Sequence, residues 1–133
     1  MSWTTSFETA DKRLRAGEIA PGITRIGLSS GPSRMGGFHA SCYLAGDLLV
    51  DAGFVHVRGL LIRFLARRPV RAVCLTHHHE DHTGACGPVA SWRGCPVYLH
   101  RPELKGEEGL CRLAFYRRVW WGRPVPYLPE EPP

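Results

Sequence analysis

The chain has 133 residues, 44% of them apolar and 22% charged, a composition typical of one globular domain with a modest hydrophobic core. Its apolar runs are only a few residues long and its N-terminal segment mixes acids with bases, so we expect neither a membrane-spanning helix nor a signal peptide. The net charge of +5 comes from arginines spread over the whole chain, so a polyanionic partner is only weakly indicated and nucleic acid is not expected. We therefore predict a cytoplasmic protein with no membrane partner.

The cysteines favour the same compartment. Their number is odd and none of them forms a Cys-x-x-Cys pair, so we expect small apolar residues or free thiols. The five are Cys42, Cys74, Cys86, Cys95 and Cys111.

The first third of the chain is predicted to hold a helix, a strand and a hairpin. Residues 5–16 indicate a short helix, and PGITRIGL at 21–28 indicates the first strand. Residues 31–40 have the glycine content of a flexible loop. The apolar runs SCYLAG and DLLVDAG, with Gly46-Asp47 between them, predict a β-hairpin.

The rest of the chain alternates helices with apolar strands. FVHVRGLLIRFLARRP (54–69) repeats apolar residues at spacings of three and four and then reaches a proline, the pattern of an amphipathic helix. VRAVCLT (70–76) is typical of a strand covered on both faces, and PVYLH (96–100) indicates another strand. Helices are predicted at 87–94 and 107–121.

This order of elements predicts the α/β fold class, with a mixed sheet in which a hairpin and parallel strands are flanked by helices. A crossover through residues 87–93 should place 72–76 and 96–100 side by side and parallel. The carboxyl ends of such strands form the edge where open α/β sheets bind ligands.

Ionisable residues crowd at that edge, in the string THHHEDH at 76–82. His77 and His79 are two apart, so on an extended turn they point the same way and can bind one ion, while Asp81 and His82 can bind a second. Imidazole nitrogens and carboxylate oxygens both suit zinc, and two ions about 3.5 to 4 Å apart would ionise a water between them. The alternative is a solvated histidine run, against which the position after a buried strand argues.

The string T-H-x-H-x-D-H resembles the signature motif of the metallo-β-lactamase superfamily. SCYLAGDLLVDAG resembles the superfamily's hairpin, which ends in an Asp-x-Gly element, here Asp51 and Gly53, and VYLH resembles the strand that follows the metal-site helix. The resemblance covers residues 21–100. It implies the N-terminal αβ half of a four-layer αβ/βα sandwich.

The same resemblance implies roles for individual residues. His77 and His79 would hold the first zinc ion, and Asp81, the expected catalytic residue, would hold the second together with His82. Asp51 would orient a metal ligand through a hydrogen bond, although a polar strand end before a glycine turn explains it nearly as well. The superfamily uses a metal-bound hydroxide to attack esters, amides, thioesters or phosphodiesters. We favour a thioester or ester hydrolase similar to glyoxalase II, with a small-molecule substrate; an RNA-processing nuclease of the same superfamily is the alternative.

The sequence departs from the superfamily's pattern downstream. Members carry another histidine, a bridging aspartate and a last histidine, but after residue 82 this chain has only His100 and no aspartate. We therefore expect a truncated chain with an incomplete dinuclear zinc site, one weakly bound ion and little activity by itself. The expected organisation is an N-terminal extension at 1–20, a metallo-β-lactamase-like domain at 21–121 and a proline-rich tail at 122–133.

Further expectations concern self-association, an alternative class of function and the remaining histidines. A sheet that lacks its second half would expose an apolar face, which favours a homodimer through that face. A second class of function is a non-catalytic metal-binding or interaction module that kept only the motif. His39 and His100 are candidates for contact with substrate, although a polar strand end is the better explanation of His100, and His56 is expected at the surface.

Overall fold

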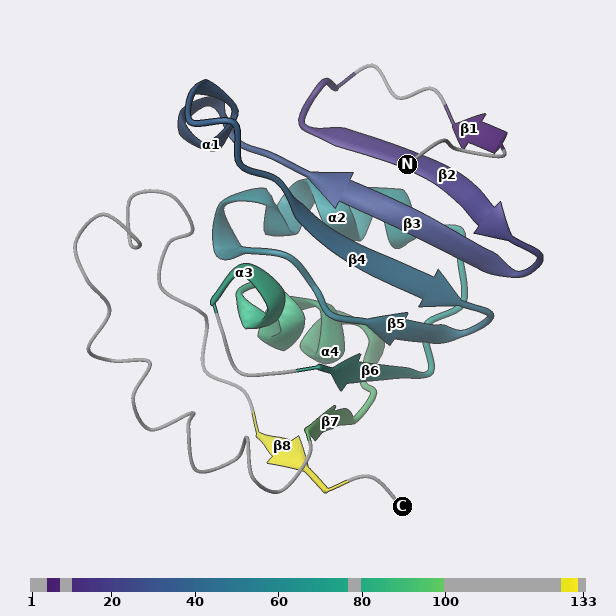
Figure 1. Cartoon of the computed structure of the whole chain (residues 1–133). Helices are drawn as coiled ribbons and strands as arrows, with labels where there is room; N and C mark the ends of the chain where they lie inside the picture. The colour runs from purple at the N-terminus through teal and green to yellow at the C-terminus, as the bar shows by residue number, and fades with distance from the viewer. Residues whose placement is uncertain (1–4, 8–10, 77–79, 100–127, 132–133) are drawn as a thin grey trace.

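The computed structural model describes residues 5–7, 11–76, 80–99 and 128–131. They form one eight-stranded sheet, in which the strands lie in the order of the chain (Figure 1). The strands are β1 (Thr5–Phe7), β2 (Leu14–Ala20), β3 (Ile23–Leu28), β4 (Ala40–Ala45), β5 (Leu48–Val50), β6 (Ala72–Leu75), β7 (Val97–Leu99) and β8 (Pro129–Glu130). The helices are α1 (Gly31–Met35), the 3-10 helix η1 (Val55–Val57), α2 (Arg58–Leu65), α3 (Glu80–Thr83) and α4 (Cys86–Arg93).

The sheet changes from antiparallel to parallel pairing at β5. Strands β1 to β5 pair antiparallel with their neighbours, and strands β5 to β8 pair in parallel. The connections from β5 to β6 and from β6 to β7 run through α2 and α4, because parallel neighbours need a crossover. The mixed sheet confirms the predicted α/β class, and the parallel pairing of β6 with β7 confirms the arrangement predicted for residues 72–76 and 96–100.

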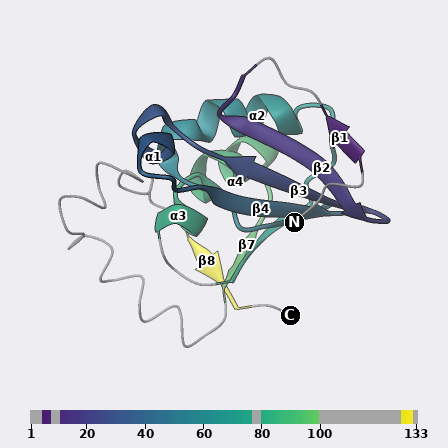
Figure 2. The same cartoon turned by 45° about the horizontal axis from the view of Figure 1, so that its top comes forward.

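Helices α2 and α4 lie on the same face of the sheet (Figures 1 and 2). The stripe predicted for 54–69 does form a helix, and it buries Leu61 and Leu65 against the strands. The predicted helix at 87–94 is α4, which buries Cys86 and Val89. Among the described residues, no helix is long and apolar enough to cross a membrane.

The hydrophobic core lies between these helices and the sheet. Alternate residues of the strands face it, such as Ile26 and Leu28 of β3 and Cys42 and Leu44 of β4, as the period of two in a strand requires. Burial raises the pKa of the Cys42 thiol, and the nearby charge of Asp51 raises it further. Cys42 therefore stays neutral and packs as a small apolar residue, as predicted.

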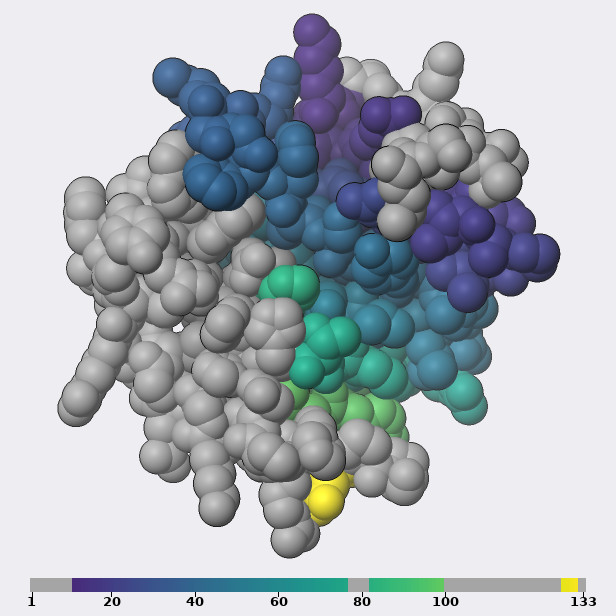
Figure 3. All heavy atoms as spheres, in the orientation of Figure 1, coloured from purple at the N-terminus to yellow at the C-terminus, as the bar shows by residue number. Residues whose placement is uncertain are grey.

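The opposite face of the sheet is turned to the viewer in Figures 1 and 3. The pairing register aligns one row across it, and every member of that row is partly buried. The row consists of Arg25, Tyr43, Val50, Cys74 and Tyr98. Self-association through this face stays a prediction.

The helix predicted for residues 5–16 is wrong. Residues 5–7 are β1 and residues 14–20 are β2, a full strand of the same sheet as β3. Pairing across the sheet decides this, because Leu14 and Ala16 are buried only when they lie beside β3. Gly22, with a φ of 75°, makes the tight turn between the two strands, a backbone that favours glycine.

Two predicted irregular segments also contain regular structure. The loop predicted at 31–40 includes α1, which begins at a capping box formed by Ser30 and Ser33. The proline-rich tail contributes β8, which pairs in parallel with β7. Pro129 is tolerated there because β8 is an edge strand, where an N–H group is not required on the solvent side. The helix predicted at 107–121 lies outside the described residues.

Candidate functional site

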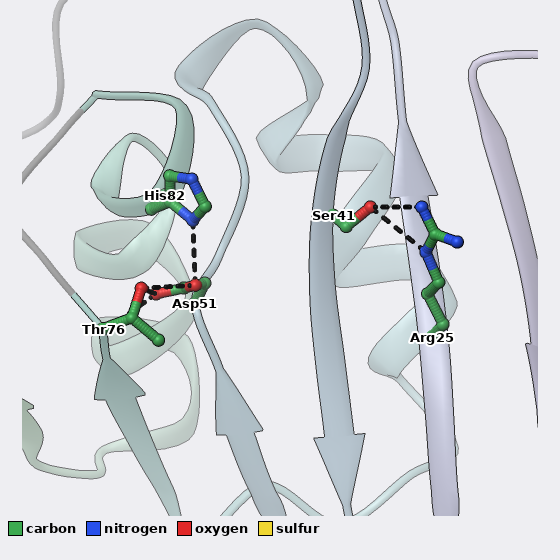
Figure 4. Close-up of polar contacts among 5 residues, drawn as sticks. All are labelled: Arg25, Ser41, Asp51, Thr76 and His82. Carbon is green, nitrogen blue, oxygen red and sulfur yellow. Dashed lines mark hydrogen bonds and ion pairs between the residues drawn. The ribbon is translucent and has the colours of Figure 1, made fainter. Parts of the chain in front are cut away.

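The candidate site lies where β5 and β6 end. These strands are parallel, so the residues that follow them, Asp51 and Thr76, meet at one edge of the sheet. Helix α3 follows β6 in the chain and contributes His82 to the same place. Figure 4 shows the three side chains together, with the Asp51 carboxylate between Thr76 and His82.

The Asp51 carboxylate is buried and accepts several hydrogen bonds. Only 3% of the residue is exposed. Thr76 donates its backbone N–H to Oδ1 over 2.9 Å and its hydroxyl to Oδ2 over 2.8 Å. The Nδ1 atom of His82 lies 2.8 Å from Oδ2. A buried carboxylate requires partners of this kind, because an isolated buried charge is strongly destabilising.

Backbone hydrogen bonds join the same two segments. The N–H of Asp51 donates to the carbonyl of Cys74, that of Ala52 to His82, and that of Gly84 to Gly53, over 2.8 to 3.0 Å. Asp51 has a φ of 62°, a left-handed conformation that aspartate adopts more readily than most side chains. The loop after β5 is thus held against α3 by its backbone as well as by its carboxylate.

The contact with Asp51 sets the state of the His82 ring. In a neutral His82 ring whose Nδ1–H donates to the Asp51 carboxylate, the lone pair of the imidazole lies on Nε2. The His82 side chain is 25% exposed, whereas that of Asp51 is 5% exposed, so the ring lies closer to solvent than its partner. A carboxylate that holds a histidine by its other nitrogen is the usual arrangement behind a metal-binding imidazole.

The other predicted site residues are described only in part. His77, His79 and His100 lie outside the described residues, and Asp81 belongs to α3 but its side chain is not among those described. Among the residues that are described, no three metal-binding side chains form a group. The metal-binding roles therefore stay predictions. His39 is exposed, in the loop before β4, and His56 is exposed as expected.

The contact between Thr76 and Asp51 was not predicted from the sequence. Thr76 is the first residue of the motif, but the spacing of the motif does not indicate that its hydroxyl contacts a residue 25 positions earlier. The group of basic side chains near His39 was not predicted either. Arg15 lies between the apolar residues Leu14 and Ala16 of β2, an alternation that the wrong helix assignment concealed.

The comparisons with known proteins agree with this geometry. The family model described as the metallo-beta-lactamase superfamily matches residues 35–110, which include the whole string from Thr76 to His82. The chain belongs to the metallo-beta-lactamase superfamily. A curated relative, the probable metallo-hydrolase YflN of Bacillus subtilis (strain 168), is 32% identical over 62 residues, which are 43% of this chain and 24% of the relative.

Solved structures show the likeness in fold. A beta-lactamase domain protein from Burkholderia ambifaria matches with a TM-score of 0.67 and 18% identity, over 95% of this chain and 46% of that one. The metallo-beta-lactamase FIM-1 from Pseudomonas aeruginosa, in its mono-zinc form, matches with a TM-score of 0.61 and 18% identity, over 75% of this chain and 47% of that one. The chain thus spans about a quarter of the curated relative from Bacillus subtilis and less than half of these structures.

Proposed function

We propose that this chain carries the metal-binding part of a metal-dependent hydrolase, and that the metal is zinc. The observation that carries the proposal is the His82 imidazole, held through Nδ1 by the buried carboxylate of Asp51 at the ligand-binding edge of the sheet. Residues 77–81 join Thr76 to His82 in the sequence and bring His77, His79 and Asp81 into the same short segment.

The donor set fits zinc. Three imidazoles and a carboxylate offer the nitrogen and oxygen atoms that zinc binds at about 2.0 to 2.2 Å. In the proposal, His77 and His79 hold one ion, and Asp81 and His82 hold a second one where the site is complete. Asp51 does not bind the metal; it fixes the tautomer and the direction of His82.

Zinc, when bound, supplies a water of lowered pKa as the nucleophile. The chain's own residues then have separate tasks. Thr76 and His82 provide hydrogen-bond partners for the buried Asp51 carboxylate, and Asp51 keeps His82 in the state that can bind a cation. We favour a thioester or ester substrate of small size, as in glyoxalase II.

The first test is metal binding by the purified chain. Dialysed wild-type chain should retain zinc, and His77→Ala/His79→Ala should lose most of it, because two of the donors are gone. His56→Ala is the matched control, since this exposed histidine lies outside the cluster. Equal zinc content in the double variant and the control would move the site elsewhere and refute the proposal.

The second test is turnover, and here we expect little. After residue 82 the sequence contains one histidine and no aspartate, so the 133-residue chain has few donors to fix two ions. An attacking atom misplaced by about 1 Å can lower a rate about a hundredfold. A thioester, a lactone and a phosphodiester, each assayed with zinc and with manganese, should therefore react slowly.

The same assay separates the competing functions. Slow thioester or lactone hydrolysis that Asp81→Ala abolishes supports the hydrolase. Preference for the phosphodiester supports an RNA-processing nuclease of the superfamily. Zinc binding with no motif-dependent turnover of any substrate supports a non-catalytic metal-binding module.

A further inference from the structure

A basic pocket opens at the edge of the sheet where α1 lies. It has a volume of about 330 Å³. Of the described residues that line it, five are basic and none is acidic. The basic ones are Lys12, Arg15, Arg25, Arg34 and His39. They come from four separate segments, so the fold, and not a run of basic sequence, brings the charges together.

The register of β2, β3 and β4 explains the floor of the pocket. Arg15, Gly27 and Ser41 lie opposite one another in one row, on the face away from α2 and α4. Gly27 has no side chain, which leaves space between its two neighbours. A Cβ atom at Gly27 would lie 3.5 Å from the carbonyl oxygen of Arg15, an ordinary contact. A larger side chain there is compatible with the backbone but would take up part of the pocket.

Arg25 is held in position over this floor. Its Nε and Nη2 atoms donate to the Ser41 hydroxyl over 3.3 and 3.2 Å (Figure 4). A guanidinium that is already oriented loses less conformational entropy when it binds a ligand. The side of the pocket formed by β3 and β4 is therefore built before any ligand arrives.

The opposite wall is also ordered by its own hydrogen bonds. Arg34 belongs to α1, where the backbone N–H of Ser30 donates to the Ser33 hydroxyl over 2.8 Å and that of Ser33 donates to Ser30 Oγ over 3.1 Å. The N–H of Phe38 donates to the carbonyl of Ser33 over 2.8 Å and closes the loop before His39.

We propose that this pocket binds small molecules that carry a phosphate or diphosphate group. Two or more guanidinium groups in one cavity provide more charge than a single carboxylate requires, and their planar forks match phosphate oxygens. The volume of about 330 Å³ is suited to a small ligand. This inference concerns binding only and does not rest on the zinc site, so either can fail without the other.

Calorimetric titration of the metal-free chain with inorganic pyrophosphate tests the proposal. The ionic strength is held constant, and chelator-treated protein is used so that binding to zinc does not contribute. Wild type should bind pyrophosphate and a phosphate monoester better than citrate, a tricarboxylate. Arg34→Gln and Arg25→Gln should each weaken binding about tenfold, as expected for loss of a charge-assisted hydrogen bond.

Arg67→Gln is the matched control, because it removes the same charge from an exposed arginine that does not line the pocket. Its affinity should stay within about twofold of wild type, since a distant surface charge is screened by salt. Gly27→Val changes no charge and should weaken binding by occupying part of the floor of the pocket. A thermal melt checks that this strand variant folds; if it does not, the two arginine variants still decide.

Three results would overturn the proposal. Pyrophosphate that fails to bind, or binds no better than citrate, removes the preference for phosphate. Equal weakening by Arg34→Gln and Arg67→Gln reduces the effect to net charge. A short single-stranded RNA that displaces pyrophosphate at much lower concentration assigns the basic side chains to a nucleic acid instead.

Discussion

The antiparallel and parallel halves of the sheet place their carboxylates in different ways. In the antiparallel half, Asp11 lies at the surface and pairs with Arg13, two residues away, over 2.6 Å. In the parallel half, Asp51 is buried and binds Thr76 and His82, which are 25 and 31 residues away. The first contact needs only local sequence, and the second exists only when β5, β6 and α3 have assembled.

The difference shows where this fold builds chemistry. Parallel strands end at one edge, so residues from distant parts of the chain converge there, whereas hairpins keep neighbours in sequence close. In the antiparallel half, Arg15 of β2 and Arg25 of β3 lie two positions apart in register on adjacent strands and line the same pocket. One half therefore forms a carboxylate–histidine site and the other a basic pocket.

The largest loss of stability is expected at Gly53, in the loop that follows β5 and carries Asp51. This residue has a φ of 65°, and a Cβ atom there would lie 2.5 Å from Cδ1 of Leu28, a buried core residue. Gly53→Ala should lower the free energy of unfolding by about 2 to 4 kcal/mol, because backbone strain and overpacking add. Urea denaturation measures this loss.

Gly46 provides the matched control for Gly53. It has a φ of 61°, but a Cβ atom there would meet nothing within 4 Å. Gly46→Ala should therefore cost only the conformational part, about 1 kcal/mol. Equal losses for the two variants would mean that Leu28 moves away at no cost, and the loop after β5 would then be less tightly packed than we infer.

Asp51→Asn tests the long-range carboxylate directly. The variant keeps the size of the side chain but loses the charge that Thr76 and His82 contact, so we expect a loss of about 1 to 3 kcal/mol. Asp47→Asn should cost less than about 0.5 kcal/mol, because its ion pair with Arg71 is exposed. NMR of the His82 ring should show a changed tautomer population in Asp51→Asn only. An unchanged tautomer population in Asp51→Asn would show that Asp51 does not determine the tautomer of His82.

Arg93 links the two crossover helices and gives a smaller effect. Its Nη2 atom donates to the carbonyls of Leu65 and Arg68 over 2.6 Å, and so α4 caps the carboxyl end of α2. Arg93→Gln should cost about 1 to 2 kcal/mol, from lost charge-assisted hydrogen bonds at a helix C-terminus. Arg67→Gln, an exposed neighbour of the same charge, should leave the denaturation midpoint unchanged. A similar shift in both would point to net charge.

The parallel half of the fold was predictable from the sequence, as were β3 and the hairpin of β4 and β5, whereas β1 and β2 were not. The stripe at 54–69 and the apolar run at 70–76 carry strong local periodicity, and both form the predicted elements. Residues 14–20 are mixed in polarity, and they become a strand because β3 offers a partner for Leu14 and Ala16. Tertiary pairing of this kind leaves little trace in a local pattern.

The candidate site was predictable as a place but not as a set of contacts. The position of Asp51 beside the end of β6 follows from parallel pairing of β5 and β6. Its left-handed backbone and its bonds to Thr76 depend on how the loop after β5 turns, which no spacing rule specifies. The basic pocket was missed because it requires three strands in register, including the one predicted as a helix.

The smallest expected effect on stability is the contribution of Asp11. The side-chain and backbone hydrogen bonds from Arg13 lower the pKa of this carboxyl from 3.8 to about 2. A carboxyl whose pKa is lowered in the folded state adds stability above its unfolded pKa, and that stability is lost as the pH falls from about 4 to about 2. The gain is small, because the pair is at the surface and its partners, two residues apart, can meet in the unfolded chain as well.

NMR titration should give Asp11 a midpoint near 2 in wild type and a midpoint close to 3.8 in Arg13→Gln, while the His82 resonances stay the same in both proteins. An Asp11 midpoint that does not move in Arg13→Gln would show that the pair of Asp11 and Arg13 fails to form in solution. The local contact of the antiparallel half would then be absent, and only the long-range contacts of Asp51 would remain.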